Sequence, residues 1–232
     1  MKADVDTMRK PFVSIIIPTL NEAENLARLL PDVKAALSEY KHEVIIVDKH
    51  SKDGTAEVAR RNGVRVLYDD NGKGSALIKG FKAAKRDIII SMDADLSHRP
   101  KELKLLISGI EAGYDVCMGS RFLTGGGSDD MPIFRRIGNK FFVMLVNIFY
   151  NAHYSDLCYG YRSFSKSATR KLRLASKGFG IETEINIKAR KENLRVIEIP
   201  SFEKKREKGS GKLNSFRDGY IILKTIFKNL FN

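Results

Sequence analysis

Short apolar runs alternate with helix-like segments along the first half of the chain, and this alternation constrains the fold more than any other feature. The runs lie at residues 12–17, 44–47, 64–68, 88–90 and 115–120 and have the length of buried strands. The segments between them repeat their apolar residues with the period of a helix. Strands and helices in this order form a mostly parallel sheet with helices on both faces. We therefore predict an α/β fold.

Local signals place the helices of this half. Asn21 can cap a helix that extends to Leu37, and Pro100 can occupy the first turn of a helix that ends near Gly113. The second half is less regular. There we predict a flexible loop at 124–130, a basic apolar segment at 133–151, a strand at 196–200, a charged loop at 201–213 and an amphipathic helix at 216–231.

The charge balance points to an anionic partner. Lys and Arg number 41 against 28 Asp and Glu, a formal net charge of +13, which suits nucleic acid, a membrane surface or a phosphorylated substrate. The 43% of hydrophobic residues exclude a disordered chain. No apolar run reaches the roughly 18 residues of a membrane span, and residues 1–10 hold no apolar signal core. With two cysteines, Cys117 and Cys158, we expect a protein of a reducing, intracellular compartment.

Asp93 and Asp95 directly follow the apolar run at 88–90. Two carboxylates on one side of a strand end repel each other and are costly to bury unless a cation lies between them. A divalent metal removes this repulsion and can bridge to a diphosphate. A solvated acidic turn is the more common explanation of such a triplet alone, but its position after a buried strand, in register with two other polar strand ends, favours a metal site.

Other polar residues follow the neighbouring strands. Residues 18–22 lie where the first strand meets its helix, whose free N–H groups favour anionic ligands, although a plain capped turn also explains them. Asp48 ends the second strand and can accept hydrogen bonds from a ribose or a base. Lys73 lies between two glycines without the Walker spacing, and we expect it near a nucleotide. Because ligands bind at the carboxyl ends of parallel strands, we expect one crevice.

Five basic residues are candidates for phosphate binding. Arg121 follows a predicted strand, and Arg135 and Arg136 begin the basic apolar segment. Arg206 and Lys212 lie in a glycine-containing loop that is suited to closing over a phosphate, although an ordinary surface loop explains it as well.

Two segments, residues 133–151 and 216–231, combine phenylalanine with basic residues. In the second, an apolar helical stripe is flanked by Arg217, Lys224 and Lys228. Such a stripe usually packs against its own protein. Two of them in one chain favour amphipathic helices that lie in the plane of a membrane with anionic lipids.

Together these motifs resemble the polyprenyl-phosphate sugar synthases of glycosyltransferase family 2, of the dolichol-phosphate mannose synthase type. The resemblance extends from Phe12 to about Ile226. The order and spacing of the motifs make it specific. The matching stretches are residues 17–25, 46–48, 53–55, 92–98, 119–122, 156, 160–162, 182–184, 206–213 and 216–219.

The resemblance implies a GT-A (Rossmann-like) fold in a single domain over residues 1–232, with a nucleotide-sugar and metal-binding half at 10–122 and an acceptor and membrane-interface half at 123–232. It implies inverting transfer of a hexose or N-acetylhexosamine from GDP-mannose, UDP-glucose or UDP-GlcNAc to dolichyl or polyprenyl phosphate. The cofactor would be Mg²⁺ or Mn²⁺, and the protein would be peripheral on the cytoplasmic face of an anionic membrane.

The resemblance and the positions above define the candidate site. Metal ligands would be Asp93, Asp95 and Ser97, and the candidate catalytic residues are Asp95, Asp156 and Arg206, with Asp156 orienting acceptor or sugar rather than acting as a base. Phosphates of donor or acceptor would contact Arg121, Arg135, Arg136, Arg206 and Lys212. The donor-binding residues would be Pro18, Leu20, Glu22, Val47, Asp48, Lys73, Asp93, Ala94 and Asp95.

Two alternatives remain at this stage. A family 2 transferase that uses a soluble or polysaccharide acceptor would share most of these motifs. A nucleic-acid-binding module would explain the charge but not the strand-end carboxylates, which would repel phosphates without a metal; we therefore expect no nucleic-acid partner. Lys49 stands where many relatives carry a second acid, and residues 71–76 are closer to relatives that use UDP-sugars, so the donor base is open.

Overall fold

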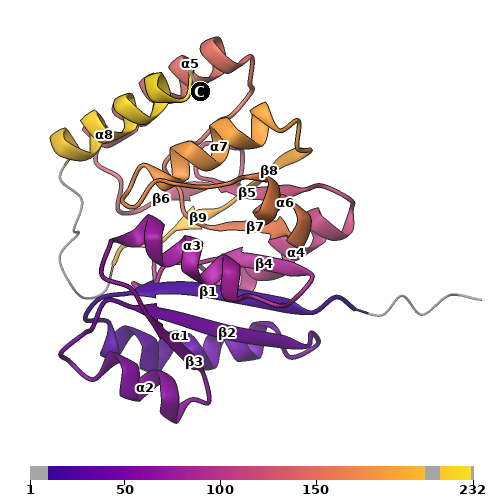
Figure 1. Ribbon diagram of the computed structural model, residues 1–232, viewed down its shortest axis with the longest axis vertical. Coiled ribbons are helices and arrows are strands. Elements are labelled where there is room, and N and C mark those ends of the chain that lie inside the picture. Colours follow the sequence, from indigo (N-terminus) through magenta and orange to yellow (C-terminus); the bar gives the residue numbers. More distant parts are fainter. Residues whose placement is uncertain (1–9, 207–214, 231–232) are drawn as a thin grey trace, which may run out of the picture.

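A seven-stranded sheet forms the centre of the computed structural model, which describes residues 10–206 and 215–230 (Figure 1). The strand order is β3-β2-β1-β4-β7-β5-β8. The strands are β1 (Val13–Thr19), β2 (His42–Asp48), β3 (Arg65–Tyr68), β4 (Ile88–Ser91), β5 (Val116–Ser120), β7 (Arg162–Ser165) and β8 (Val196–Pro200).

Six of these strands run in one direction, and β7 runs antiparallel between β4 and β5. Strands were expected at six of the seven positions, so the mostly parallel sheet is confirmed. No local pattern predicted β7, α6 (Lys166–Lys171) or α7 (Ile181–Lys191).

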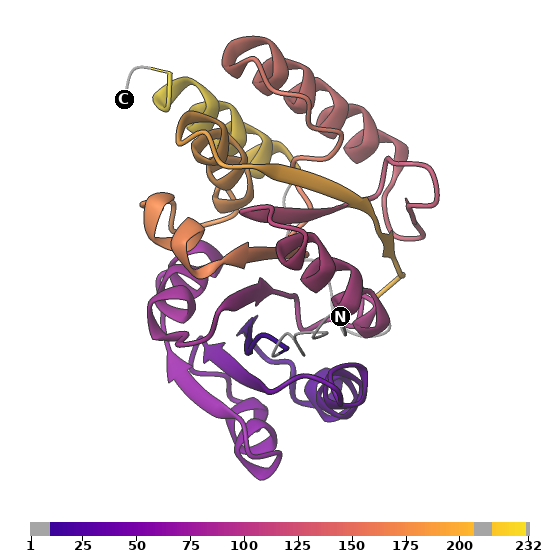
Figure 2. The same ribbon diagram turned by 90° about the vertical axis from the view of Figure 1, so that its right-hand side faces the viewer.

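Helices cover both faces of the sheet, as Figure 2 shows from the side. On one face, α1 (Ala23–Ala36), α2 (Thr55–Arg61) and α4 (Leu103–Glu111) pack against strand residues such as Ile15 and Ile17. On the other, α3 (Lys73–Ala83) and α7 pack against residues such as Ile16. Successive side chains of β1 thus enter opposite core layers, as the pleat of a buried strand requires.

The start of α1 differs from the prediction that Asn21 caps it. Asn21 has a positive φ of 56°, and its side-chain oxygen accepts a hydrogen bond from the Lys52 N–H at 3.0 Å instead. Two N–H groups at the start of α1 are bound by a distant segment: the Ala23 N–H donates to Asp53, and the N–H of the preceding Glu22 donates to Thr55 at the start of α2, both at 2.9 Å. The cap comes from a distant segment, which no local pattern could show.

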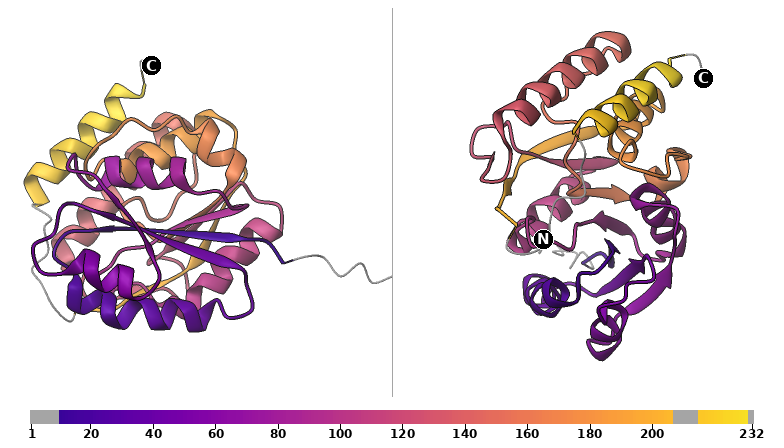
Figure 3. Two further views of the ribbon diagram at one scale, coloured as in Figure 1. Left: turned by 60° about the horizontal axis from the view of Figure 1, so that its bottom comes forward. Right: turned by 90° about the vertical axis from the view of Figure 1, so that its left-hand side faces the viewer.

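Two helices, α5 (Ile133–Tyr150) and α8 (Ser215–Lys228), lie side by side at one end of the molecule (Figures 1 and 3). Phe134 contacts Phe216 near the start of both helices, and Phe149 contacts Phe227 near their ends, so the two run in the same direction. Within residues 10–206 and 215–230, no helix is long and apolar enough to cross a membrane.

The predicted loops at 124–130 and 201–213 are partly ordered against each other. Gly127–Ser128 forms β6 and Phe202–Glu203 forms β9, and the two pair in parallel as a small second sheet. A short 3-10 turn, Pro100–Glu102, precedes α4, so Pro100 does occupy a first turn as expected.

Candidate functional site

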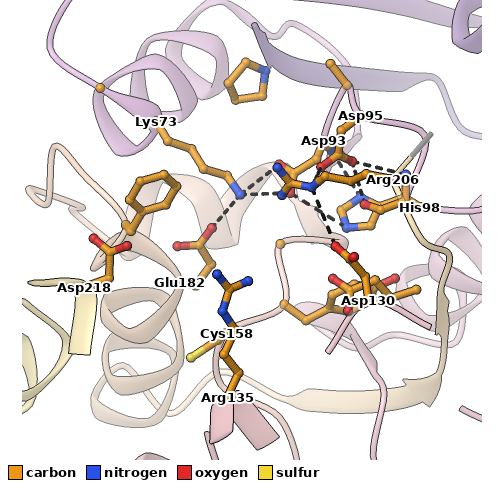
Figure 4. Close-up of a pocket in the computed structure, with 18 of the residues that line it drawn as sticks. Lys73, Asp93, Asp95, His98, Asp130, Arg135, Cys158, Glu182, Arg206 and Asp218 are labelled. Carbon is orange, nitrogen blue, oxygen red and sulfur yellow. Dashed lines mark hydrogen bonds and ion pairs between the residues drawn. The ribbon is translucent and has the colours of Figure 1, made fainter. Parts of the chain in front are cut away.

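A cavity of about 510 Å³ opens at the carboxyl edge of the sheet (Figure 4). Its wall includes residues that follow β1, β2 and β4, the first turns of α3 and α7, and one side each of α5 and α8. Parallel strands bring their carboxyl ends to one edge, which is why sequence-distant segments meet here.

The structure brings most of the candidate site residues to this cavity. Asp48, Asp156 and Arg136 are not among the lining residues that the structure describes, and Lys212 lies outside the described ranges. The candidate residues that do line the cavity are Pro18, Leu20, Glu22, Val47, Lys73, Asp93, Ala94, Asp95, Ser97, Arg121, Arg135 and Arg206.

Asp48 is fully buried behind the cavity wall. Its carboxylate accepts hydrogen bonds from the Thr19 hydroxyl at 2.8 Å, the Ser51 N–H at 2.8 Å and the Ser51 hydroxyl at 2.6 Å. These bonds join the last residue of β1 to the end of β2 and the loop that follows it. Asp48 therefore shapes the wall, while its neighbours Val47 and Lys49 reach the cavity.

Lys73 connects two carboxylates inside the cavity, and Figure 4 shows its side chain extending between them. Its Nζ lies 2.8 Å from Asp93 Oδ1 and 2.9 Å from Glu182 Oε1. Burial disfavours the charged form of Lys73, but the two acids outweigh it and raise the pKa of the lysine. Burial likewise disfavours ionised Asp93, yet Lys73 lowers the pKa of that carboxyl to about 2.

Asp95 is held by a different cation. Arg206 Nε lies 2.8 Å from Asp95 Oδ2 and 3.9 Å from Asp130 Oδ2. The other oxygen of Asp95 accepts hydrogen bonds from the N–H of Ser97 at 3.1 Å and its hydroxyl at 2.6 Å. Leu96, between them, has a positive φ of 65°, an uncommon conformation for a large side chain that turns the chain back on itself here.

The donor set suits a divalent metal that prefers oxygen. Asp93 and Asp95 supply carboxylates and Ser97 a hydroxyl, the ligand type that Mg²⁺ and Mn²⁺ favour. Each carboxylate already carries a cationic partner from the chain, so the site balances its negative charge. The part of the chain that the structure describes has no cluster of three or more His, Cys, Asp or Glu side chains fit to hold a metal. The rest of the coordination would fall to water and a ligand's phosphate oxygens.

Arg121 faces two acids of its own chain. It binds Asp156 through Nε at 2.7 Å and through a terminal nitrogen at 2.9 Å, and Glu203 at 3.1 Å. Its guanidinium also lies over the Tyr159 ring, 4.8 Å from the centroid. Because Asp156 is buried and bound in this way, its carboxylate holds Arg121 at the cavity wall and does not itself reach the cavity.

Sequence reasoning assigned no role to several lining residues. Glu182 and His98 were noticed only as members of longer motifs. In the structure, Glu182 binds Lys73, the partner of Asp93, and His98 lies beside Asp93 itself. Burial lowers the pKa of His98. Glu182 lies in the first turn of a helix without a strong apolar pattern, so only its motif could have signalled it.

Known proteins resemble the chain in sequence. The model of glycosyl transferase family 2 matches residues 14–173. The dolichol-phosphate mannosyltransferase of Pyrococcus furiosus is 35% identical over 226 residues, covering 94% of this chain but 61% of its own length. The polyprenol monophosphomannose synthase of Mycolicibacterium smegmatis is 30% identical, over 92% of this chain and 84% of its own. The chain thus spans under two thirds of the archaeal relative.

Solved structures share the fold at low sequence identity. Glucosyl-3-phosphoglycerate synthase from Mycobacterium tuberculosis, in complex with Mn²⁺, UDP and glucosyl-3-phosphoglycerate, has a TM-score of 0.75 at 17% identity and matches 95% of this chain and 80% of its own. Mannosyl-3-phosphoglycerate synthase from Rubrobacter xylanophilus has a TM-score of 0.77 at 19% identity, over 95% of this chain and 74% of its own. These likenesses confirm the predicted GT-A fold. The family match over residues 14–173, together with the Mycolicibacterium smegmatis relative that the chain covers to 84%, establishes that the chain belongs to glycosyl transferase family 2.

Proposed function

We propose that this protein transfers a sugar from a nucleotide sugar to a polyprenyl phosphate such as dolichyl phosphate, with inversion at the anomeric carbon. The donor sugar is a hexose or N-acetylhexosamine linked to GDP or UDP. The observation that carries the choice of acceptor is the position of Phe134, which lines the cavity and is also 56% exposed on the outer face of α5. The cavity that holds the charged cluster therefore opens beside an apolar surface.

The donor would bind at the strand ends. Pro18, Leu20, Glu22 and Val47 line the part of the cavity nearest β1 and β2 and would hold the nucleoside. Asp93, Asp95 and Ser97 would hold the divalent metal, which when bound supplies positive charge against the diphosphate. A solved structure with the same fold holds Mn²⁺ and UDP, which supports a divalent metal and a nucleotide donor here.

The reaction requires alignment of the two substrates and positive charge near the diphosphate rather than a strong base. A lipid phosphate is already an anionic nucleophile near neutral pH, so no side chain has to remove a proton from it. Lys73 and Arg206 place two positive charges beside the aspartate pair, where they would stabilise the departing diphosphate. Arg121 and Arg135 line the same cavity and would bind the acceptor phosphate.

The apolar surface of α5 and α8 would hold the protein on a membrane. It consists of large exposed side chains on two parallel helices: Ile133, Phe134, Ile137, Phe141, Met144, Ile148, Phe149, Phe216, Tyr220 and Phe227. Basic residues on both helices, such as Arg136 and Lys224, suit anionic headgroups. We place the protein on the cytoplasmic face, and its two unpaired cysteines fit a reducing compartment.

A donor and acceptor panel tests the reaction. Labelled GDP-mannose, UDP-glucose and UDP-GlcNAc are each incubated with the protein, Mn²⁺ or Mg²⁺, and dolichyl phosphate in vesicles, and the lipid extract is counted. We expect label in the lipid from one donor, and a loss of at least about 100-fold in Asp95→Asn. Asp32→Asn, at an exposed position of α1, is the control. Transfer to water-soluble acceptors alone would contradict the proposed acceptor, and full turnover by Asp95→Asn would contradict the metal assignment.

Vesicle sedimentation tests the membrane surface separately. Ile137 and Ile148 of α5 are 61% and 67% exposed. Replacing either with Glu should weaken binding to phosphatidylglycerol vesicles by about tenfold or more, since burying one such side chain contributes roughly 1.5–3 kcal/mol. Leu105→Glu changes an exposed apolar residue of α4, on the opposite face of the sheet, and should leave binding unchanged. Equal losses in all three variants would rule out a specific membrane surface on α5.

A further inference from the structure

We infer that His98 is a positioning residue that fixes the conformation of Asp93 through a hydrogen bond to the main chain. The inference rests on the metal-binding role of Asp93 under the proposed function. It concerns a side chain to which the sequence motifs assigned no role.

The contact between the two residues is direct. The peptide N–H of Asp93 donates a hydrogen bond to His98 Nδ1 at 3.1 Å. Nδ1 must therefore be unprotonated, and the ring proton lies on Nε2. Nε2 is 4.0 Å from Asp93 Oδ2, too far for a hydrogen bond. The ring thus holds the main chain of Asp93 and leaves its carboxylate to Lys73.

Two tyrosines hold the ring in place. Tyr161 stacks on it with ring centroids 4.6 Å apart and planes 8° apart, and Tyr159 meets it edge-on at 4.8 Å. The tyrosine hydroxyls are tied as well, that of Tyr161 to the Arg99 carbonyl at 3.0 Å and that of Tyr159 to Ser201 at 3.1 Å. The side chain of His98 is 1% exposed. These contacts restrict the His98 ring to one rotamer, so Nδ1 is an acceptor in a fixed position.

Asp93 needs such an acceptor because strand pairing ends just before it. The last main-chain bond between β4 and β1 is donated by the Met92 N–H to the Ile16 carbonyl at 3.1 Å. A peptide N–H beyond the ladder must find another partner when it is removed from water. In the part of the chain that the structure describes, His98 supplies it, and so sets the direction in which the Asp93 side chain leaves the strand.

Four variants separate this role from simple packing. His98→Phe keeps a ring between the tyrosines but has no acceptor. His98→Asn can place an amide oxygen near the position of Nδ1, whereas His98→Gln carries its amide to the level of Nε2. His42→Phe is the matched control, since His42 Nδ1 lies 3.0 Å from the Tyr40 carbonyl at the amino end of β2, away from the cavity.

The measurement is Mn²⁺ binding to the full chain by electron paramagnetic resonance, with Mn²⁺ alone and with Mn²⁺ plus UDP. We expect His98→Phe and His98→Gln to weaken Mn²⁺ binding by about tenfold or more, as lost outer-shell partners of metal ligands do. His98→Asn should stay within about threefold of the wild type, and His42→Phe should match it. Rescue by Asn but not Gln is an effect that lost packing would not produce, and it is informative even if the Phe variant fails to fold.

Asp95→Asn in the same assay separates the two proposals. If it leaves Mn²⁺ affinity unchanged, the metal assignment fails and the inference about His98 fails with it. If it abolishes binding while His98→Gln and His98→Asn bind equally well, the metal assignment stands and the positioning role of His98 is overturned.

Discussion

Arg162 offers a direct measurement of what holds the wall of the site together. It is the largest fully buried side chain among the described residues. Its guanidinium donates to three main-chain carbonyls, those of Tyr159 at 2.8 Å, Glu182 at 2.9 Å and Leu157 at 3.0 Å. These bonds join β7 to the loop before it and to the first turn of α7. Arg162→Met keeps much of the side-chain length and removes all three donors.

The magnitude follows from two opposing contributions. A hydrogen bond from a charged donor contributes about 1.5–3 kcal/mol, so three contribute about 4.5–9 kcal/mol. Burial of the guanidinium opposes this by several kcal/mol, and it lowers the pKa of Arg162. We therefore expect Arg162→Met to lower the free energy of unfolding by about 3–5 kcal/mol, the range seen when one partner of a buried charged contact is removed. That is a large part of the roughly 5–15 kcal/mol that stabilises a typical domain.

Urea unfolding followed by circular dichroism measures the difference. The midpoint should fall while the slope with urea concentration stays the same. Arg190→Met is the control, because Arg190 also donates to a carbonyl, that of Asn151 at 2.9 Å, but in an exposed setting; its loss should stay below about 1 kcal/mol. A loss below about 1 kcal/mol for Arg162→Met would refute the argument, as would equal losses in the two variants.

Two further predictions concern packing and charge. Gly80→Ala should destabilise the protein by about 1–3 kcal/mol, since the new Cβ would lie 2.2 Å from Ile16 Cγ2. Gly138→Ala should stabilise α5 by about 0.5–1 kcal/mol, because a Cβ there meets nothing within 4 Å. Urea unfolding that shows the same sign for both variants would contradict this. Arg206→Gln removes the cation 2.8 Å from Asp95 and should tighten the binding of Mn²⁺ alone by about two- to fivefold, as expected for a partly exposed ion pair; a paramagnetic resonance titration with unchanged or weaker affinity would contradict it.

The first half of the fold was predictable because its signals are local. Buried parallel strands such as β1 and β2 are continuous apolar runs, and the helices between them carry one apolar stripe each. The strand ends then follow from the rule that parallel strands finish at one edge. This rule placed Asp93 and Asp95 in one crevice with residues 18–22, and both aspartates do line the cavity.

The second half lacked such signals because buried polar residues interrupt its apolar runs. β7 reads Arg-Ser-Phe-Ser and is buried at its first three positions. Its Ser163 donates to the Leu106 carbonyl at 2.7 Å, a partner 57 residues away. In α7, Glu182, Thr183 and Glu184 are buried as well. A pattern search assigns such residues to the surface, since burial of polar groups depends on tertiary partners that the local sequence does not contain.

Dependence on distant partners also explains which candidate site residues were correctly predicted to line the cavity and which were not. A residue whose position depends on its own strand, such as Asp95, reaches the cavity as expected. A residue whose orientation depends on a distant partner does not follow from its position: Asp156 turns to Arg121, and Asp48 turns to Thr19. The network of buried charges at this edge is therefore set by contacts between loops rather than by any single motif. Substitutions in those loops should alter the site even where the motif residues are unchanged.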